Sequence, residues 1–411
     1  MLAVAFVSFA AGFGQFGAVA ALGDVARSFG HLTHGATIAD QAGLSGTELG
    51  VGLAVLRLAS LGGLPLAALA DGLGRRRVLL ASCAAGLGLT ILAAASPGYW
   101  WFVVIFALGR PLLSTTSALA QVIAAEQTDT ANRSRAVALI TAGYGLGAGL
   151  IAVVHSLGSS VLGFRGVFGL AVLPLAVVPF VGPAIGEPDR FARLEARARR
   201  APVLGALGAA HRSRLAVVAS VAFLLAVTTG PANGFVYLYS QNVRHLSGLT
   251  IAAMVVVAGA AGLLGLVVGQ WLADRAGRRV TAAGAMIAIA LCGMLTYSGS
   301  RAGLAIGYVL GILAGSVFAP AAGAFANELF PTAVRASIAG WEVAASVLGA
   351  TAGLVVFGAI ADRGGNFSVA ALVTFATALP GAALFFLLPE TRGRELEEIW
   401  PDAPAADARE A

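Results

Sequence analysis

Two stretches of the chain place an aspartate a few residues before a group of arginines. The first reads Ala-Asp-Gly-Leu-Gly-Arg-Arg-Arg over residues 70–77, and the second reads Ala-Asp-Arg-Ala-Gly-Arg-Arg over residues 273–279. A carboxylate and several guanidinium groups across a short turn can form charge-assisted hydrogen bonds in one conformation and lose them in another. We expect such a latch in each stretch, made by Asp71, Gly74, Arg75, Arg76, Asp274, Arg275, Gly277 and Arg278. The alternative is that the arginines only set the orientation of the chain in a membrane.

A second pair of charges repeats at almost the same interval. The two aspartates are 203 positions apart, and Glu126 with Arg133 recurs as Glu328 with Arg335 after a shift of 202. Seven residues are about two helical turns, so each pair joins the end of one apolar segment to the start of the next. We expect Glu126 with Arg133 and Arg135, and Glu328 with Arg335, to complete the two latches. The repeated spacing predicts that the chain is a duplication.

Two further arginines, Arg57 and Arg110, stand near the middle of long apolar stretches. A charged side chain at the centre of a bilayer costs about 2.5–3.5 kcal/mol on insertion scales, so these residues are candidates for function. A guanidinium group binds a carboxylate through two parallel hydrogen bonds, which predicts contact with an anionic substrate. The alternatives are pairing with a carboxylate or with carbonyl oxygens freed by Pro111, and for Arg57 a side chain that extends to the membrane surface.

Other polar side chains within apolar stretches are also candidates. Those considered for substrate contact are Gln15, Asn233, Tyr237 and Trp341, and each could equally make a hydrogen bond between helices. Asn233 and Tyr237 follow the helix-breaking residues 230–231, and an interrupted helix suits a binding site. Glu342 is the candidate for a proton-coupling site.

The remaining titratable residues predict no metal site and no cofactor. Asp24 and Arg27 are three residues apart, so we expect a local ion pair. His31 and His34 have helix-like spacing but no third ligand beside them. The two cysteines lie in apolar stretches, where they are expected to pack against other small residues.

The elements that carry these residues are membrane-spanning helices. The chain is 58% hydrophobic and 11% charged, with a mean hydropathy of +0.87, which is too apolar for a water-soluble protein of 411 residues. A span needs about 20 apolar residues, and long continuous runs exclude the short alternating strands of a β-barrel. Twelve spans are expected, near residues 2–26, 46–70, 78–97, 99–125, 135–156, 165–185, 215–239, 249–272, 280–299, 303–327, 336–360 and 367–388.

The distribution of arginine predicts the topology. All 26 basic residues are arginine, and with a cytoplasmic N-terminus 19 of them fall on the cytoplasmic side and four outside. The positive-inside rule therefore places both termini in the cytoplasm, and the net charge of +6 reflects topology and not affinity for nucleic acid. The predicted organisation is a six-helix bundle over residues 1–186, a cytoplasmic linker over 187–214, a second six-helix bundle over 215–389, and a cytoplasmic tail over 390–411.

The repeated stretches resemble the loop motif of the major facilitator superfamily, Gly-x-x-x-Asp-Arg/Lys-x-Gly-Arg/Lys-Arg/Lys, and the resemblance extends over the whole chain. Ala67 and Gly72 depart from that motif in the first copy, and Gln270 departs from it in the second. Residues 389–393, Pro-Glu-Thr-Arg-Gly, resemble the segment that follows the last helix in the sugar-porter branch, and metabolite:proton symporters have similar tails. The Gln-Gln-x-Ser-Gly pattern of sugar porters is missing from the seventh span.

The resemblance and the repeat together predict function. Two half-length membrane repeats are typical of a secondary transporter that exposes one site to each side in turn. The expected substrate is a small polar solute, an organic acid or other metabolite or a sugar, carried with a proton by a monomer in contact with membrane lipid, in a bacterial plasma membrane. The alternatives are proton-antiport efflux of drugs or metabolites, and a transport-inactive sensor or a membrane enzyme. No enzymatic activity is expected, and without lysine the chain cannot contain a phosphate-binding Gly-x-x-x-x-Gly-Lys loop.

Overall fold

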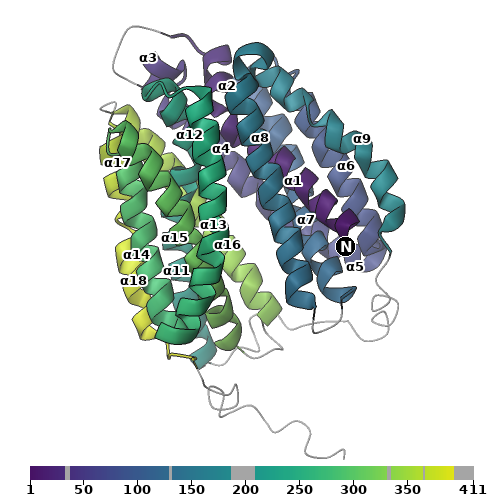
Figure 1. The fold of residues 1–411 in the computed structure, drawn as a ribbon, viewed down its shortest axis with the longest axis vertical. Helices are drawn as coiled ribbons and strands as arrows, with labels where there is room; N and C mark the ends of the chain where they lie inside the picture. Colours follow the sequence, from purple (N-terminus) through teal and green to yellow (C-terminus); the bar gives the residue numbers. More distant parts are fainter. Residues whose placement is uncertain (33–37, 129–131, 187–208, 331–334, 364–365, 393–411) are drawn as a thin grey trace, which may run out of the picture.

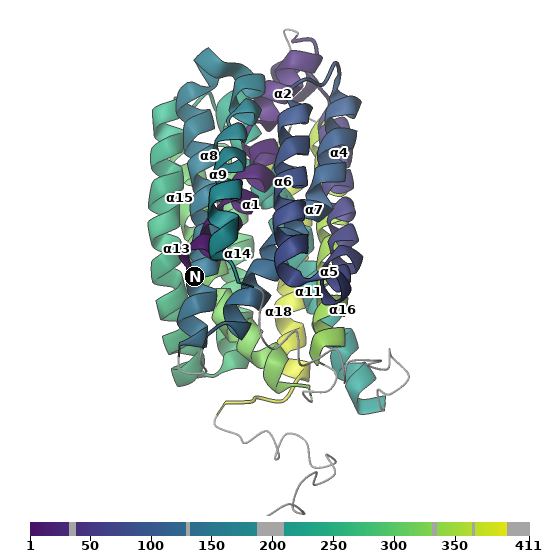
Figure 2. The same ribbon diagram turned by 90° about the vertical axis from the view of Figure 1, so that its right-hand side faces the viewer.

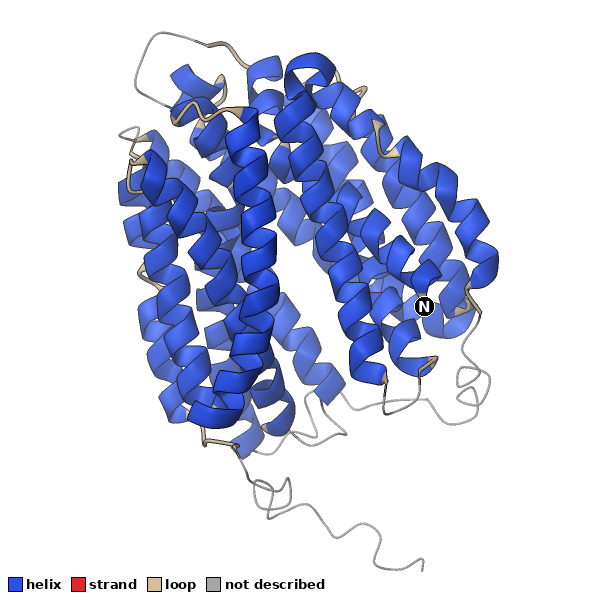
Figure 3. Ribbon diagram, viewed as in Figure 1, coloured by secondary structure: helices blue, strands red, loops and turns tan. Residues whose placement is uncertain are grey.

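The structure, a computed structural model, describes residues 1–32, 38–128, 132–186, 209–330, 335–363 and 366–392. His34, most of the predicted linker and the tail beyond residue 392 lie outside these ranges. Within the ranges, the side chains of Asp71, Arg133 and Arg335 are not described. All regular secondary structure in the described ranges is helical (Figure 3), which confirms the predicted fold class.

The helices follow one another in two groups. The first group is α1 (Leu2–Ala20), α2 (Leu22–Phe29), α3 (Ile38–Ala42), α4 (Gly46–Ala59), η1 (Ser60–Gly62), α5 (Gly63–Leu73), α6 (Arg75–Ala93), α7 (Tyr99–Glu126), α8 (Arg133–Gly169), α9 (Val172–Val181) and η2 (Gly182–Ala184). The second group is α11 (Ala209–Gly234), α12 (Val236–Leu238), η3 (Tyr239–Val243), α13 (Gly248–Ala276), α14 (Arg278–Thr296), α15 (Arg301–Glu328), α16 (Arg335–Asp362), α17 (Phe367–Phe375), α18 (Ala378–Leu384) and η4 (Phe385–Leu387). The two groups lie side by side, with their helices along the long axis of the molecule (Figures 1 and 2).

The described helices include eleven segments that are long and apolar enough to cross a membrane. One of them runs from Arg135 to Ala184, and its 50 residues would extend about 75 Å as one helix, more than twice a bilayer core of about 30 Å. The backbone turns within this segment at Gly163, where φ is +59°, a conformation that glycine adopts without strain. The segment therefore supplies two spans, and the total of twelve agrees with the sequence.

The duplication is visible in the packing of equivalent helices. In the first half α1 packs along α8, and in the second half α11 packs along α16. Both contacts depend on glycine: a Cβ at Gly147 would lie 2.0 Å from the carbonyl oxygen of Phe9, and a Cβ at Gly349 would lie 2.2 Å from that of Phe223. Gly147 and Gly349 are 202 positions apart, the same shift that relates the charged motifs.

The buried apolar residues form three cores that differ at the two ends of the molecule. We call the end with the turns at Gly74 and Gly277 the inner end, which the arginine distribution predicts to be cytoplasmic, and the opposite end, with Ser45 and Gly299, the outer end. At the outer end one core combines residues of both halves, whereas towards the inner end each half has a core of its own. The halves are therefore joined at the outer end and separate towards the inner end, which is an inward-open arrangement if the inner end faces the cytoplasm.

Candidate substrate site and gates

Arg57 and Arg110 are placed by two breaks in the helices that carry them. Arg57 lies in the last turn of α4, and the span continues through the 3-10 turn Ser60–Gly62 into α5, which contains Pro65. Arg110 precedes Pro111, which cannot donate a backbone hydrogen bond inside α7. The two breaks touch, because the hydroxyl of Thr115 donates to the carbonyl oxygens of both Gly63 (3.1 Å) and Pro111 (2.9 Å). This contact fixes both arginines at the same depth of the first half.

Gln15 on α1 links the arginine pair to two more helices. Arg110 Nη1 donates to the main-chain oxygen of Gln15 at 3.0 Å, and the Tyr144 hydroxyl donates to Gln15 Oε1 at 3.3 Å. Gln15 Nε2 donates to Ser117 Oγ at 3.4 Å, and the Gln15 residue is only 5% exposed. Residues of α1, α4, α7 and α8 thus converge on one polar cluster, of which sequence reasoning missed Ser117.

The polar cluster faces a small cavity between the two halves. Gln15, Arg57 and Arg110 line this cavity from the first half, and residues that include Gly230, Gly234 and Leu354 line it from the second. Its volume is about 20 Å³, which is room for one water molecule and not for a metabolite. The cavity must therefore widen before a solute can touch both arginines.

No described carboxylate pairs with either arginine of the cavity. The ion pairs of the described chain are made by other basic residues, and Arg110 Nε is buried without a hydrogen-bond partner. Two guanidinium groups on one cavity repel each other, and uncompensated buried charge is costly. The cavity is consequently a place where a bound anion would be stabilised.

The other candidates for substrate contact lie elsewhere in this conformation. Asn233 donates to the Thr229 oxygen at 2.9 Å, four residues back on the same helix. Tyr237 is fully buried, and its hydroxyl lies 3.2 Å from that of Tyr308. Trp341 is 44% exposed on α16. Their part in binding stays a prediction.

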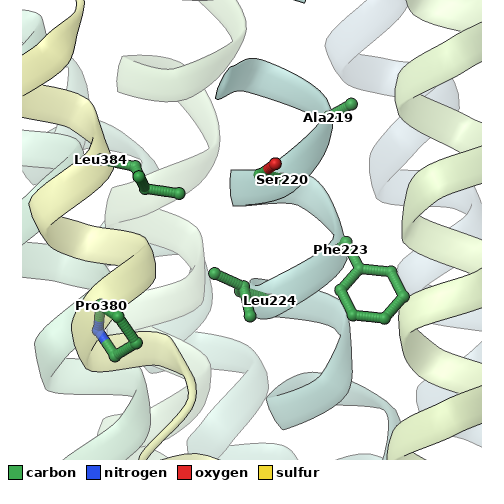
Figure 4. A pocket seen from close by; sticks show the side chains of 6 residues that line it. All are labelled: Ala219, Ser220, Phe223, Leu224, Pro380 and Leu384. Atoms are coloured by element: carbon green, nitrogen blue, oxygen red, sulfur yellow. The ribbon is translucent and has the colours of Figure 1, made fainter. Parts of the chain in front are cut away.

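Glu342 lines a separate cavity within the second half. This cavity has a volume of about 460 Å³ and is surrounded mainly by apolar residues of α11, α15, α16 and η4, together with Thr229 and Ser346. A further apolar pocket lies between α11 and α18, where the side chains of Phe223, Leu224 and Pro380 border it (Figure 4), and none of the predicted site residues lines it. Glu342 is thus half-buried in apolar surroundings, apart from the arginine cluster.

The charged motifs form equivalent ion pairs at the inner end of each half. Arg75 pairs with Glu126 in the first half, and Arg278 Nε lies 2.8 Å from Glu328 Oε2 in the second. The glycine before each of these arginines has a positive φ, +96° at Gly74 and +101° at Gly277, as the sharp turn requires. The pairing partner of Glu126 that the structure describes is therefore the motif arginine, whereas the sequence suggested Arg133 and Arg135.

The second copy has an additional carboxylate at its turn. Glu390, from the segment after the last span, accepts hydrogen bonds from the backbone nitrogens of Arg278 (3.0 Å) and Arg279 (3.2 Å) and so caps α14. Asp274 is exposed, and Arg275 stacks on the ring of Trp271 at 5.0 Å.

The outer end is closed by a carboxylate of the second half on a helix of the first. Asp362, the last residue of α16, accepts hydrogen bonds from the backbone nitrogens of Gly46 (2.5 Å) and Thr47 (2.7 Å) and from the Thr47 hydroxyl. These donors form the first turn of α4, where the helix dipole favours a negative charge. Gly358 lets the two backbones approach, since a Cβ at this position would lie 2.1 Å from the Gly46 oxygen.

A second polar contact at the outer end corrects a prediction. Asp24 does not pair with Arg27, which is exposed; its carboxylate lies 2.8 Å from Nε2 of His155 on α8. The two residues are 131 positions apart, so no local spacing could indicate the pair. A buried histidine within a span was nonetheless a signal that sequence reasoning missed.

The arrangement of the two halves defines a class of protein. Two equivalent helix bundles enclose a cavity at their interface, share a core at one end only, and carry paired charges at the other end, as in a membrane transporter that opens to one side at a time. The family model described as Major Facilitator Superfamily matches residues 4–300, and the model described as Sugar (and other) transporter matches residues 203–402. The chain belongs to the major facilitator superfamily, whose members are transporters and not enzymes.

Individual relatives agree with this assignment. The chain is 27% identical, in an alignment of 392 positions that covers 90% of this chain and 89% of the relative, to a Cupriavidus pinatubonensis protein named "Probable 4-methylmuconolactone transporter". Its fold is similar to the inward open conformation of the xylose transporter from E. coli, with a TM-score of 0.72, 16% identity and coverage of 97% and 98% of the two chains. It is also similar to a nucleoside transporter, with a TM-score of 0.73, 15% identity and coverage of 94% and 98%. The protein is a multi-pass membrane transporter of small molecules.

Proposed function

We propose that the protein takes up a small organic anion together with a proton, and that Arg57 and Arg110 bind the anion. The observation that carries this proposal is the presence of two guanidinium groups, without a described carboxylate partner, on one cavity between the halves. A carboxylate there can accept paired hydrogen bonds from an arginine and offset the cost of the buried charges. Gln15 and Tyr144, already connected to Arg110, supply neutral hydrogen-bonding groups beside it.

The small volume of the cavity fits a step of the transport cycle. With the outer end closed and only about 20 Å³ available, the arginines are withdrawn from a solute-sized space. A rocking motion of one half against the other would separate the residues of α1, α4 and α7 from those of α11 and α16. The anion site would then form when the halves part at the outer end, and the inner end would close in that state.

Glu342 is the residue that we propose for the co-transported proton. It lies beside a cavity with mainly apolar walls, where a neutral carboxylic acid is favoured over the ion. Transfer of a monovalent anion with one proton carries no net charge, so uptake would follow a pH gradient. The names of the relatives support a metabolite as the substrate, since one is named for 4-methylmuconolactone.

The experiment is a thermal-shift screen of the purified protein against carboxylates, aromatic acids, sugars and lipophilic cations. A ligand at a hundred times its Kd stabilises the folded protein by about 2.7 kcal/mol, which gives a measurable shift. We expect a carboxylate to stabilise the wild type and to lose its effect in Arg110→Ala. A sugar or cation that stabilises wild type and Arg110→Ala alike would contradict the anion site.

Proton-antiport efflux is a second candidate, because one observation favours it. The cavity beside Glu342 is large enough, at about 460 Å³, and apolar enough to hold a lipophilic cation against the carboxylate. In that case a cation in the same screen should stabilise the wild type and fail to stabilise Glu342→Gln, whereas Arg110→Ala should respond normally.

A further inference from the structure

Three polar side chains bridge the two halves at the outer end: Asp24, His155 and Gln241. Asp24 (α2) and His155 (α8) belong to the first half, and Gln241 (η3) belongs to the second. The Asp24 carboxylate lies 2.8 Å from His155 Nε2, and Gln241 Nε2 lies 3.4 Å from His155 Nδ1. The His155 side chain is 0% exposed, whereas that of Asp24 is 21% exposed. The imidazole is thus enclosed between a carboxylate and an amide that come from different halves.

The hydrogen bonds of this bridge differ with the protonation of His155. When the ring is neutral, Nε2–H donates to Asp24 and Nδ1 accepts from the Gln241 amide, and Gln241 Oε1 is then buried without a partner. When the ring is charged, both nitrogens donate, and a half-turn of the Gln241 amide lets Oε1 accept from Nδ1. The amide NH₂ group then turns towards Gly23, where Asn242 Oδ1 is another buried acceptor without a partner. Protonation therefore removes an unsatisfied acceptor and places a cation beside a carboxylate.

We propose that Asp24 and His155 form a proton-binding site, and that the bound proton holds the outer end closed. The proposal concerns the gate and not the transported ion, so it is independent of whether the substrate is an anion or a cation. Opening the outer end moves Gln241 away with the second half and admits water to the imidazole. The charged ring then loses the amide oxygen, and its attraction to Asp24 is weakened by the solvent.

The sign of the effect follows from proton linkage. The closed outer end binds the proton more tightly than the open one, so lowering the pH shifts the equilibrium towards closure. For one proton the ratio of closed to open molecules changes by at most about tenfold per pH unit.

Other charged groups at this end could contribute to a pH effect and are separated by the experiment. Arg27 is exposed on α2, and Arg244 and His245 follow η3. Arg165, near the end of α8, donates to the main-chain oxygens of Ala94 and Ser96. The described outer ends of α1, α6, α7 and α13 carry no charged side chain. The titratable residue among them is Tyr99, at the start of α7. His31 is exposed just after α2, and Asp40 lies on α3, which packs against α2 and η3.

The test measures the closure of the outer end directly by pulsed electron paramagnetic resonance. Spin labels are placed at Val161, which is 87% exposed, and at Arg301, in the full-length protein with Cys83→Ala and Cys292→Ala. The label distance distribution is recorded in nanodiscs between about pH 5 and 8, without substrate and without a gradient. We expect the short-distance population to grow as the pH falls, and a wild-type distribution that does not change with pH would overturn the proposal without any variant.

Variants assign the effect to the site. We expect His155→Gln and Asp24→Asn each to lose the pH dependence, and Gln241→Leu to reduce it while leaving the ion pair in place. The matched control is His245→Asn, an exposed histidine with φ of +50°, which asparagine tolerates and which should keep the wild-type response. If His155→Gln retains the response or His245→Asn abolishes it, the site is wrong. Because no solute is present, this outcome is separate from success or failure of the proposed anion uptake.

Discussion

The contact of Asp362 with α4 makes a quantitative prediction about the resting conformation. The carboxylate accepts hydrogen bonds from two backbone nitrogens, at 2.5 and 2.7 Å, and from the Thr47 hydroxyl, and all three donors belong to the other half. Ser45 is the N-cap residue of α4, and the Asp362 carboxylate adds a second cap to the same turn from across the interface; removal of a helix cap costs about 0.5–2 kcal/mol. We expect Asp362→Ala to shift the equilibrium between closed and open outer ends by about 1–2 kcal/mol, a factor of roughly 5–30.

The size of the effect should follow the contacts that remain. Asp362→Asn keeps one acceptor oxygen but loses the charge, so its shift should be smaller than that of Asp362→Ala. Thr47→Val removes only the hydroxyl contact and should have the smallest effect of the three. The neighbouring Arg363 is exposed, and Arg363→Gln serves as the matched control because it changes one charge at the same end.

The assay is the distance distribution between labels on the two halves, at one pH and with the wild type as reference. We expect the long-distance population to rise in the order Thr47→Val, Asp362→Asn, Asp362→Ala. Equal populations in Asp362→Ala and wild type would refute the inference that this cap closes the outer end. A shift in Arg363→Gln as large as that in Asp362→Ala would show that charge alone, and not the cap, is responsible.

Three further predictions concern the packing, the inner ion pairs and the proton. Gly147→Ala should prevent α1 from packing on α8 and abolish monodisperse protein in size-exclusion chromatography, whereas Gly145→Ala, with no atom within 4 Å of the added Cβ, should behave as wild type. Arg278→Glu should lower the unfolding temperature, and the exchange Arg278→Glu with Glu328→Arg should restore part of the loss if the 2.8 Å pair is stabilising. Glu342→Gln should abolish uptake driven by a pH gradient and spare exchange of solute for solute, and normal gradient-driven uptake in this variant would exclude Glu342 as the proton site.

The repeats explain why much of the fold could be predicted from sequence. Charged residues are rare in this chain, so two motifs separated by 203 positions indicate equivalent turns, and the apolar runs between them indicate the spans. The structure has Gly74 and Gly277 in the same left-handed turn and pairs the following arginines with equivalent glutamates. The boundary between the fifth and sixth spans was less accurate, because α8 continues to the turn at Gly163 beyond the predicted end at residue 156.

The contacts between halves could not be read from the sequence. The Asp24–Arg27 prediction failed because an interaction three residues apart on a helix competes with a buried imidazole brought in by tertiary packing. Asp362 is 316 positions from Gly46 and 315 positions from Thr47, and nothing in the sequence distinguishes it from any other aspartate at the end of a span. Arg57 and Arg110 were indicated by their depth in apolar runs, but their common cavity depends on the contact between two helix breaks.

The central claim is that Arg57 and Arg110 bind the transported anion, and uptake into proteoliposomes tests it most directly. A carboxylate identified in the thermal-shift screen is supplied in radiolabelled form with an inward proton gradient, and uptake is compared among wild type, Arg57→Gln, Arg110→Gln and Arg110→Lys. A charge-assisted hydrogen bond contributes about 1.5–3 kcal/mol, so each glutamine variant should lose roughly tenfold to hundredfold in kcat/KM, with partial recovery in Arg110→Lys. Saturable anion uptake at the wild-type level in both glutamine variants would contradict the claim.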